Sequence, residues 1–151
     1  MRRREFLIRS AGIGAGLTLF GRRVVRASSK TAMMVYKDPG CGCCEKWVDL
    51  MKGAGFEVSV RDTTDMDSIK RRYHIPDQLA SCHTAQVSGY LVEGHVPADL
   101  IQKMLAEKPK IAGLAVPGMV TGSPGMEGPS PQKYDVLAFD AAGKTTVYAR
   151  R

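Results

Sequence analysis

Cysteine is scarce in this sequence, and no apolar run is long enough to cross a membrane. Only four cysteines occur in 151 residues, all of them between positions 41 and 82. Four is too few for a fold built on disulfides. The best candidate for a membrane span, residues 11–20, is half the length of the roughly 20 residues that a spanning helix needs. We therefore expect a domain with its own apolar core and no transmembrane helix in the mature protein.

Excess positive charge is also missing once the N-terminal segment is set aside. Residues 1–27 hold seven arginines and one glutamate, and so carry six of the seven formal positive charges. Residues 28–151 keep 15 basic and 14 acidic side chains. A nucleic-acid partner requires a basic face on the folded domain, so we predict no nucleic-acid function. We interpret Lys70-Arg71-Arg72, the densest basic run that remains, as a solvated helix face.

The first 27 residues have the three regions of a secretory signal. A basic start, a short apolar run with several glycines, and Val25-Arg26-Ala27 before a cleavage site follow one another. Arg3-Arg4-Glu5-Phe6-Leu7 also resembles the twin-arginine export motif; the alternative is an ordinary secretory signal with arginine-rich ends. We predict a twin-arginine-type signal peptide at 1–27, one domain at 28–151, and a periplasmic location.

Strand and helix patterns alternate through the rest of the chain. They predict, in order, a strand at 33–36, a helix carrying Trp47, Leu50, Met51 and Ala54, a strand at 56–60, a helix at 65–73, a strand at 86–93, a helix at 97–105, and a hairpin of strands at 134–139 and 145–148. The first strand–helix–strand unit implies parallel pairing. Residues 108–132 are rich in Gly and Pro, and a loop of that length is functional or mobile.

The position of the cysteines narrows the fold class. They lie on the turn between the first strand and the first helix, as in the thioredoxin fold, which this order of elements resembles. We predict an α/β, thioredoxin-like domain with a mixed sheet flanked by helices. It should carry a Gly/Pro/Met-rich C-terminal metal-binding loop and a terminal β-hairpin.

Three cysteines within four positions favour metal binding over disulfide exchange. Cys41 and Cys44 form a Cys-x-x-Cys pair, and Cys43 lies between them. A helix N-terminus favours thiolates, which attack disulfides and bind soft metals. Disulfide exchange needs only two thiols, and a third invites scrambling. The patch suits Cu(I), zinc or an iron–sulfur cluster, but its spacing matches neither ferredoxin patterns nor the usual paired zinc spacing. Export to a copper-exposed compartment therefore favours copper, and bridging sulfur allows more than one ion.

Cys82 and His83 form a second candidate group. Cys82 lies in Ser81-Cys82-His83-Thr84, just before a predicted strand. We expect Cys82 to close the site as a fourth thiolate, with His83 as an imidazole ligand or an outer group. The alternative is a plain disulfide between Cys82 and Cys43, with His83 on the surface.

Two Pro-Gly-Met triplets place Met119 and Met126 in the Gly/Pro-rich loop. Their thioethers are soft ligands, so we include both as candidate copper ligands, although methionine more often fills gaps in a core. His95 either approaches the site or has a structural role.

Four separated motifs, taken together, resemble the CopG-type copper-resistance proteins. The motifs are Asp38-Pro39-Gly40-Cys41-Gly42-Cys43-Cys44-Glu45-Lys46-Trp47, Ser81-Cys82-His83-Thr84-Ala85, Gly89-Tyr90-Leu91-Val92-Glu93-Gly94-His95-Val96-Pro97, and the two Pro-Gly-Met stretches of residues 113–127. The resemblance implies a thioredoxin-like domain whose C-terminal extension helps to bind metal. It also implies a cysteine-bridged multinuclear copper cluster and a role in interconverting Cu(I) and Cu(II). The implied ligands are Cys41, Cys43, Cys44 and Cys82, followed by His83, His95, Met119 and Met126. Val120 stands where similar proteins have proline, which should loosen the loop.

Three hypotheses for function follow. The first is an exported copper protein that cycles the oxidation state of its metal as a copper oxidoreductase. The second is a thiol–disulfide oxidoreductase in which Cys41 attacks and Cys44 resolves. The third is passive copper storage, or a chaperone that passes copper to a periplasmic efflux partner.

Overall fold

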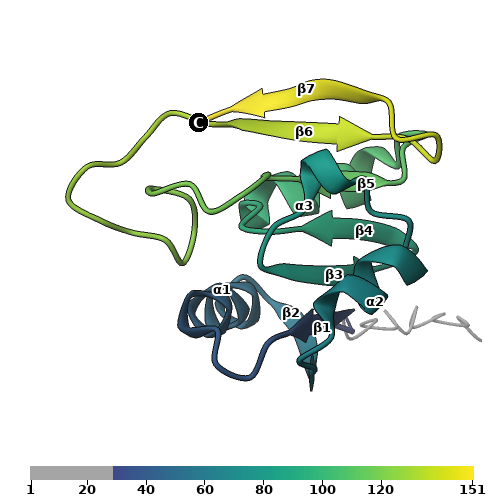
Figure 1. The fold of residues 1–151 in the computed structure, drawn as a ribbon. Helices are drawn as coiled ribbons and strands as arrows, with labels where there is room; N and C mark the ends of the chain where they lie inside the picture. The colour runs from purple at the N-terminus through teal and green to yellow at the C-terminus, as the bar shows by residue number, and fades with distance from the viewer. Residues whose placement is uncertain (1–28) are drawn as a thin grey trace, which may run out of the picture.

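A seven-stranded mixed sheet with helices on both faces forms the domain (Figure 1). The computed structural model describes residues 29–151, so the predicted signal peptide lies outside the described residues. The elements run in the order β1 (Thr31–Lys37), α1 (Gly42–Gly53), β2 (Phe56–Asp62), α2 (Met66–Arg72), the short 3-10 helix η1 (Asp77–Leu79), β3 (His83–Val87), β4 (Tyr90–Glu93), α3 (Ala98–Glu107), β5 (Gly113–Ala115), β6 (Asp135–Phe139) and β7 (Thr145–Arg150).

The strand order is β2-β1-β3-β4-β5-β6-β7. β1 is parallel to β2, as the short strand–helix–strand unit requires, and β3 and β4 continue the sheet in antiparallel pairs. This first part has the arrangement of a thioredoxin fold and confirms the predicted class. β5 pairs with β4 in parallel, and the predicted terminal hairpin, β6 and β7, extends the sheet beyond β5 in antiparallel pairs.

The two faces of the sheet have separate apolar layers. α1 and α3 bury Trp47, Val48, Met51, Leu100, Ile101 and Met104 against one face. On the other face, Ile75 and Leu79 pack on Ala115 and Phe139, and the Tyr73 hydroxyl bonds that of Tyr36 across 2.9 Å. Leu50, which the helical spacing placed on the apolar side of the first helix, is 45% exposed.

The predicted single strand at 86–93 is wrong, because this stretch folds back on itself. Ser88 and Gly89 have positive φ angles of 47° and 86° and form the turn between β3 and β4. A Ser-Gly pair is itself a turn signal, which the apolar pattern around it obscured. Because of this turn, the end of β4 lies beside the start of β3, and Glu93 pairs with Thr84.

Strand β5 was not predicted, because three residues within a Gly- and Pro-rich stretch are too few to show the alternation of apolar and polar residues typical of a strand. Gly113 is required there because a Cβ would lie 2.0 Å from the Leu91 carbonyl oxygen. Within residues 29–151, no helix has the length and apolar character needed to cross a membrane.

Candidate metal centre

The cysteine turn is built on Asp38, directly after β1. The Cys41 amide donates to the Asp38 carbonyl across 3.1 Å, and the Gly40 amide donates to the Asp38 carboxylate across 2.8 Å. Cys41 is the N-cap residue of α1, so the cysteines occupy the start of the helix. The Cys44 side chain faces the core and is fully buried, whereas Cys41 and Cys43 are partly exposed.

Cys41 and Cys44 form a disulfide, with their Cα atoms 5.3 Å apart. Cys43 and Cys82 are free thiols, so the alternative of a Cys43–Cys82 disulfide is wrong for this state of the protein. The Cys43 sulfur lies 3.5 Å from that of Cys41. The disulfide places two of the four predicted sulfur ligands in oxidised form, and reduction by two electrons would release them as thiols.

Cys82 joins this turn from a distant part of the sequence. Its sulfur lies in one group with those of Cys41, Cys43 and Cys44, all within 4.8 Å of one another. Within the same limit Cys82 belongs to a second group, with ring nitrogens of His83 and His95. Cys82 is therefore common to a sulfur-only group and a Cys-His-His group.

His95 is held so that one ring nitrogen faces Cys82. Its Nδ1 lies 2.7 Å from the Pro124 carbonyl oxygen, which can only accept, so Nδ1 carries the proton. Nε2 then has a free lone pair and lies 2.9 Å from the Cys82 sulfur. A fixed tautomer of this kind is typical of metal-ligating histidines, whose second nitrogen donates to a backbone carbonyl.

His83 is buried, so the alternative of a surface histidine is wrong. Its Nδ1 lies 3.5 Å from the Cys82 sulfur. Its Nε2 has no hydrogen-bond partner among the described residues, which is costly for a buried polar atom. The Trp47 ring packs 4.4 Å from the His83 ring, and its indole N–H donates to the Val96 carbonyl.

Burial sets the protonation of these groups. It lowers the pKa of His83 well below the usual value, with His95 and Lys70 adding to the effect, and it also lowers the pKa of His95. Both imidazoles are therefore neutral near pH 7, the form that binds metals. Burial, followed by the neighbouring Cys43, raises the pKa of the Cys82 thiol to about 11. A metal binding to Cys82 must displace a proton.

A segment of the loop between β5 and β6 lies against the cysteine turn. Figure 1 shows this loop reaching toward the side of the molecule where α1 begins. Gly125 has φ +85°, and a Cβ there would lie 2.8 Å from the Cys43 carbonyl oxygen and 3.0 Å from the Trp47 backbone nitrogen. Its amide donates to the Glu127 carboxylate across 2.8 Å. Only glycine allows the Pro124 carbonyl to approach His95 this closely.

The two loop methionines are placed differently from each other. Met119 is 56% exposed, but its neighbour Gly118 bridges to Ser81, beside Cys82. Met126 follows Gly125 directly and is partly buried. Both therefore lie in the part of the loop that meets the site, and their role as ligands stays a prediction. Val120 is partly buried, and its carbonyl accepts hydrogen bonds from the Ser123 amide and hydroxyl.

Several residues that hold this site together were not predicted from the sequence. Lys70 is not part of a fully solvated run, because its ammonium pairs with the buried Glu93 carboxylate. Two further contacts join residues that are far apart in the sequence: His95 donates to the Pro124 carbonyl, and the Trp47 ring packs against the His83 ring. The only sequence signal for them was their position inside the motifs already noted.

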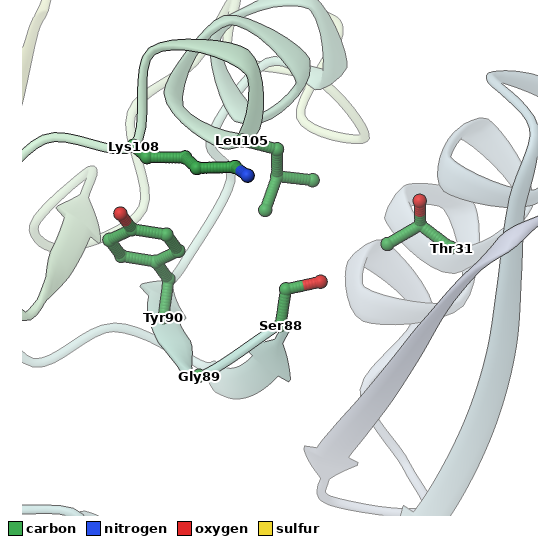
Figure 2. A pocket seen from close by; sticks show the side chains of 6 residues that line it. All are labelled: Thr31, Ser88, Gly89, Tyr90, Leu105 and Lys108. Carbon is green, nitrogen blue, oxygen red and sulfur yellow. The ribbon is translucent and has the colours of Figure 1, made fainter.

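An open cavity of about 570 Å³ lies at the opposite end of the sheet (Figure 2). It is lined by residues at the start of β1, at the turn between β3 and β4, and at the end of α3, among them Thr31, Ser88 and Lys108. Cys41 instead follows the end of β1, and Cys82 precedes the start of β3. The cavity therefore has no part in the cysteine site.

Comparison with known proteins agrees with the resemblance to CopG-type copper-resistance proteins. A family model described as a protein of unknown function, DUF411, matches residues 79–126. Two solved structures, described as form 2 and form 1 of the copper resistance protein CopG, each share 41% sequence identity with this chain at a TM-score of 0.76. Each alignment covers 81% of this chain and 98% of the matched one. No curated protein gives a significant match.

Proposed function

Because the chain belongs to the family of the copper resistance protein CopG, we propose that it binds copper at the cysteine site and interconverts Cu(I) and Cu(II). Cys41, Cys43, Cys44 and Cys82 are the proposed core ligands. His95 and His83 complete the set from the buried side, and Met119 and Met126 are the proposed thioether ligands from the loop.

The convergence of Cys82 with the 41–44 turn is the observation that carries this proposal. Once the Cys41–Cys44 disulfide is reduced, four thiol sulfurs within 4.8 Å form a donor set that soft metals prefer, and Cu(I) is the softest of the common candidates. The Nδ1 of buried His83, 3.5 Å from the Cys82 sulfur, and the oriented Nε2 of His95, 2.9 Å from it, also fit a metal, because each is a neutral imidazole nitrogen beside this thiol. The residues present therefore suit copper on the grounds of donor type, protonation and orientation.

The shared position of Cys82 supports a thiolate-bridged site for more than one ion. A single sulfur common to an all-sulfur group and a Cys-His-His group can bridge two metal ions. The two groups also differ in preference, since thiolates favour Cu(I) and imidazoles accept Cu(II) as well. A bridged pair of such environments suits a protein that changes the oxidation state of copper.

The Cys41–Cys44 pair can supply electrons for this chemistry. Two Cu(II) ions and the dithiol give two Cu(I) ions, one disulfide and two released protons. Re-reduction of the disulfide then needs an external dithiol, which takes up the oxidising equivalents. In this scheme Cys41 and Cys44 are ligands while reduced and leave the ligand set when they form the disulfide, and Cys43 and Cys82 remain as thiolates that retain the product.

We place the protein in the periplasm, exported by its 1–27 segment, with residues 28–151 as the mature domain. Cu(I) released there would pass to efflux components. Replacing both Arg3 and Arg4 by lysine should block export, because the twin-arginine pair is the feature that this route reads. Cell fractionation with an antibody to the mature domain measures this. Normal export of the double variant would rule out the twin-arginine route while leaving ordinary secretion open.

Thiol–disulfide exchange is the second candidate, and the Cys41–Cys44 disulfide at a helix start favours it. In that function Cys41 attacks a substrate and Cys44 resolves. Passive copper storage is a third candidate that uses the same ligands. Stopped-flow oxidation of the Cu(I)-loaded protein separates storage from redox cycling, because only cycling needs fast electron transfer.

One preparation tests the proposal against thiol–disulfide exchange. Protein purified without oxygen is assayed together for bound copper, visible absorption and reduction of insulin disulfides, with Cys43→Ser as the variant. We expect several coppers per chain in the wild type and a loss of most of them in Cys43→Ser. A metal-free wild type that reduces insulin, and keeps that activity in Cys43→Ser, would establish the disulfide oxidoreductase instead.

A further inference from the structure

Glu93 is a fully buried carboxylate at the end of β4, beside the candidate metal centre. Its Oε1 accepts from the Lys70 ammonium of α2 and from the Ser81 amide, the latter across 2.7 Å. Its Oε2 accepts from the Thr84 hydroxyl across 2.6 Å, and Lys70 also donates to Thr84 across 3.3 Å. Every oxygen of this carboxylate is therefore hydrogen-bonded.

The contacts of Glu93 lie on both sides of Cys82 and His83. Ser81 immediately precedes this pair and Thr84 immediately follows it, so one carboxylate fixes the backbone before the pair and the side chain after it. No other carboxylate of the described residues reaches both positions by a hydrogen bond.

Glu93 also lies next to the segment that carries His95, the residue in contact with Cys82. Gly94 follows Glu93, and its amide donates to the His83 carbonyl across 2.9 Å. Gly94 has no space for a side chain, because a Cβ would lie 2.5 Å from the Ser81 hydroxyl. His95 comes next and lies 2.9 Å from the Cys82 sulfur. Glu93 thus stands at the point where the Cys82 segment and the His95 segment are joined.

We propose that Glu93, neutralised by Lys70, is a positioning residue that holds Cys82 against His95 for metal binding. This inference rests on the proposed copper function, and it names a residue outside the ligand set. A buried ion pair is a weak source of stability, because desolvation of both charges offsets their attraction. The geometry points instead to placement of the two ligands, which outer-shell hydrogen bonds commonly provide at metal sites.

The decisive variant removes both charges together. In Glu93→Leu with Lys70→Met no buried charge is left unpaired, and such replacements are often neutral for stability, but the bonds to Ser81 and Thr84 are lost. Glu93→Gln, also made with Lys70→Met so that no buried charge is left unpaired, is the conservative comparison, because its amide keeps a carbonyl for Ser81 and an N–H for Thr84. Val136→Ala, in the buried core of β6, is the control for loss of stability alone.

Two quantities are measured in each folded variant. The first is Cu(I) affinity by competition with a chelator, together with the absorption spectrum of the copper-loaded protein. The second needs no metal: the rate at which iodoacetamide alkylates Cys82 in the reduced apoprotein, followed by peptide mass spectrometry. A purely structural ion pair would change the melting temperature but neither of these readouts beyond the Val136→Ala control.

We expect the Glu93→Leu double variant to bind Cu(I) about 10–100-fold more weakly, the range seen for outer-shell changes, with an altered spectrum. Its Cys82 should be alkylated several-fold faster, since the thiol leaves His95. The Glu93→Gln double variant should keep most of the affinity. Wild-type affinity, spectrum and alkylation rate in the Glu93→Leu double variant would overturn the inference, as would a Glu93→Gln double variant that loses copper as fully as the Glu93→Leu one.

Thr84→Val provides the same test if the Glu93→Leu double variant does not fold. It removes one hydrogen bond to Glu93 and no charge, so the same changes should appear at smaller size, and wild-type values would overturn the inference. The alkylation arm separates this inference from the copper function. A wild type that binds no copper refutes the proposed function, while the change in Cys82 alkylation still decides whether Glu93 positions the thiol.

Discussion

Cys82→Ser should remove most of the bound copper while leaving the Cys41–Cys44 disulfide able to form. Cys82 is the one residue common to the all-sulfur group and the Cys-His-His group, so its loss damages both. Serine keeps the size and shape of the side chain but replaces a soft ligand with a hard one. We expect Cu(I) affinity to fall by at least about 100-fold, the upper end of the range for outer-shell changes. Copper analysis and chelator competition measure the effect.

The same variant distinguishes copper binding from disulfide exchange. Insulin reduction through Cys41 and Cys44 does not require Cys82, so an enzyme of that class would keep its activity in Cys82→Ser. A melting temperature close to that of the wild type serves as the control for folding. Wild-type copper content in a folded Cys82→Ser protein would contradict a ligand role for this residue.

Gly125→Ala should destabilise the protein and weaken copper binding together. The new Cβ would lie within 3.0 Å of backbone atoms of Cys43 and Trp47, which belong to a helix and cannot move aside easily. Overpacking of this kind costs about 1–3 kcal/mol, and the φ of +85° adds about 1–2 kcal/mol for a residue with a side chain. Displacement of the loop also takes the Pro124 carbonyl away from His95. Urea unfolding and Cu(I) competition measure the two effects.

Gly118→Ala is the matched control for this substitution. Gly118 lies in the same loop with φ +69°, but a Cβ there would meet nothing within 4 Å. This variant should therefore show only the backbone cost, about 1–2 kcal/mol, and should keep its copper affinity. Equal losses in the two variants would mean that the contact of Gly125 with the cysteine turn has no special importance.

The part of the site that could be predicted from the sequence consists of residues that are close together along the chain. Cys41, Cys43 and Cys44 lie within four positions, and a strand pattern before them with a helical pattern after them was enough to predict a turn at a helix start. The thioredoxin-like class followed from the same order of elements. Cys82 could be grouped with the turn because cysteines are so few and because its motif resembles that of the CopG-type proteins.

The remainder depends on contacts that have no period in the sequence. The relation of His95 to Cys82 arises because the chain turns at Ser88-Gly89, and an apolar run on both sides of that turn read as one strand. The Pro124 carbonyl reaches His95 from 29 residues away and uses only the backbone, so the residue type gives no sign of it. Lys70 looked like a solvated basic residue because its partner, Glu93, is 23 positions further on.

The most direct test of a shared copper site is X-ray absorption at the copper edge on the reduced, Cu(I)-loaded protein. We predict a first shell dominated by sulfur, with a nitrogen contribution that falls in His95→Ala and a copper–copper vector that disappears in Cys82→Ser. A first shell of nitrogen and oxygen, or a spectrum that is the same with and without Cys82, would contradict the account.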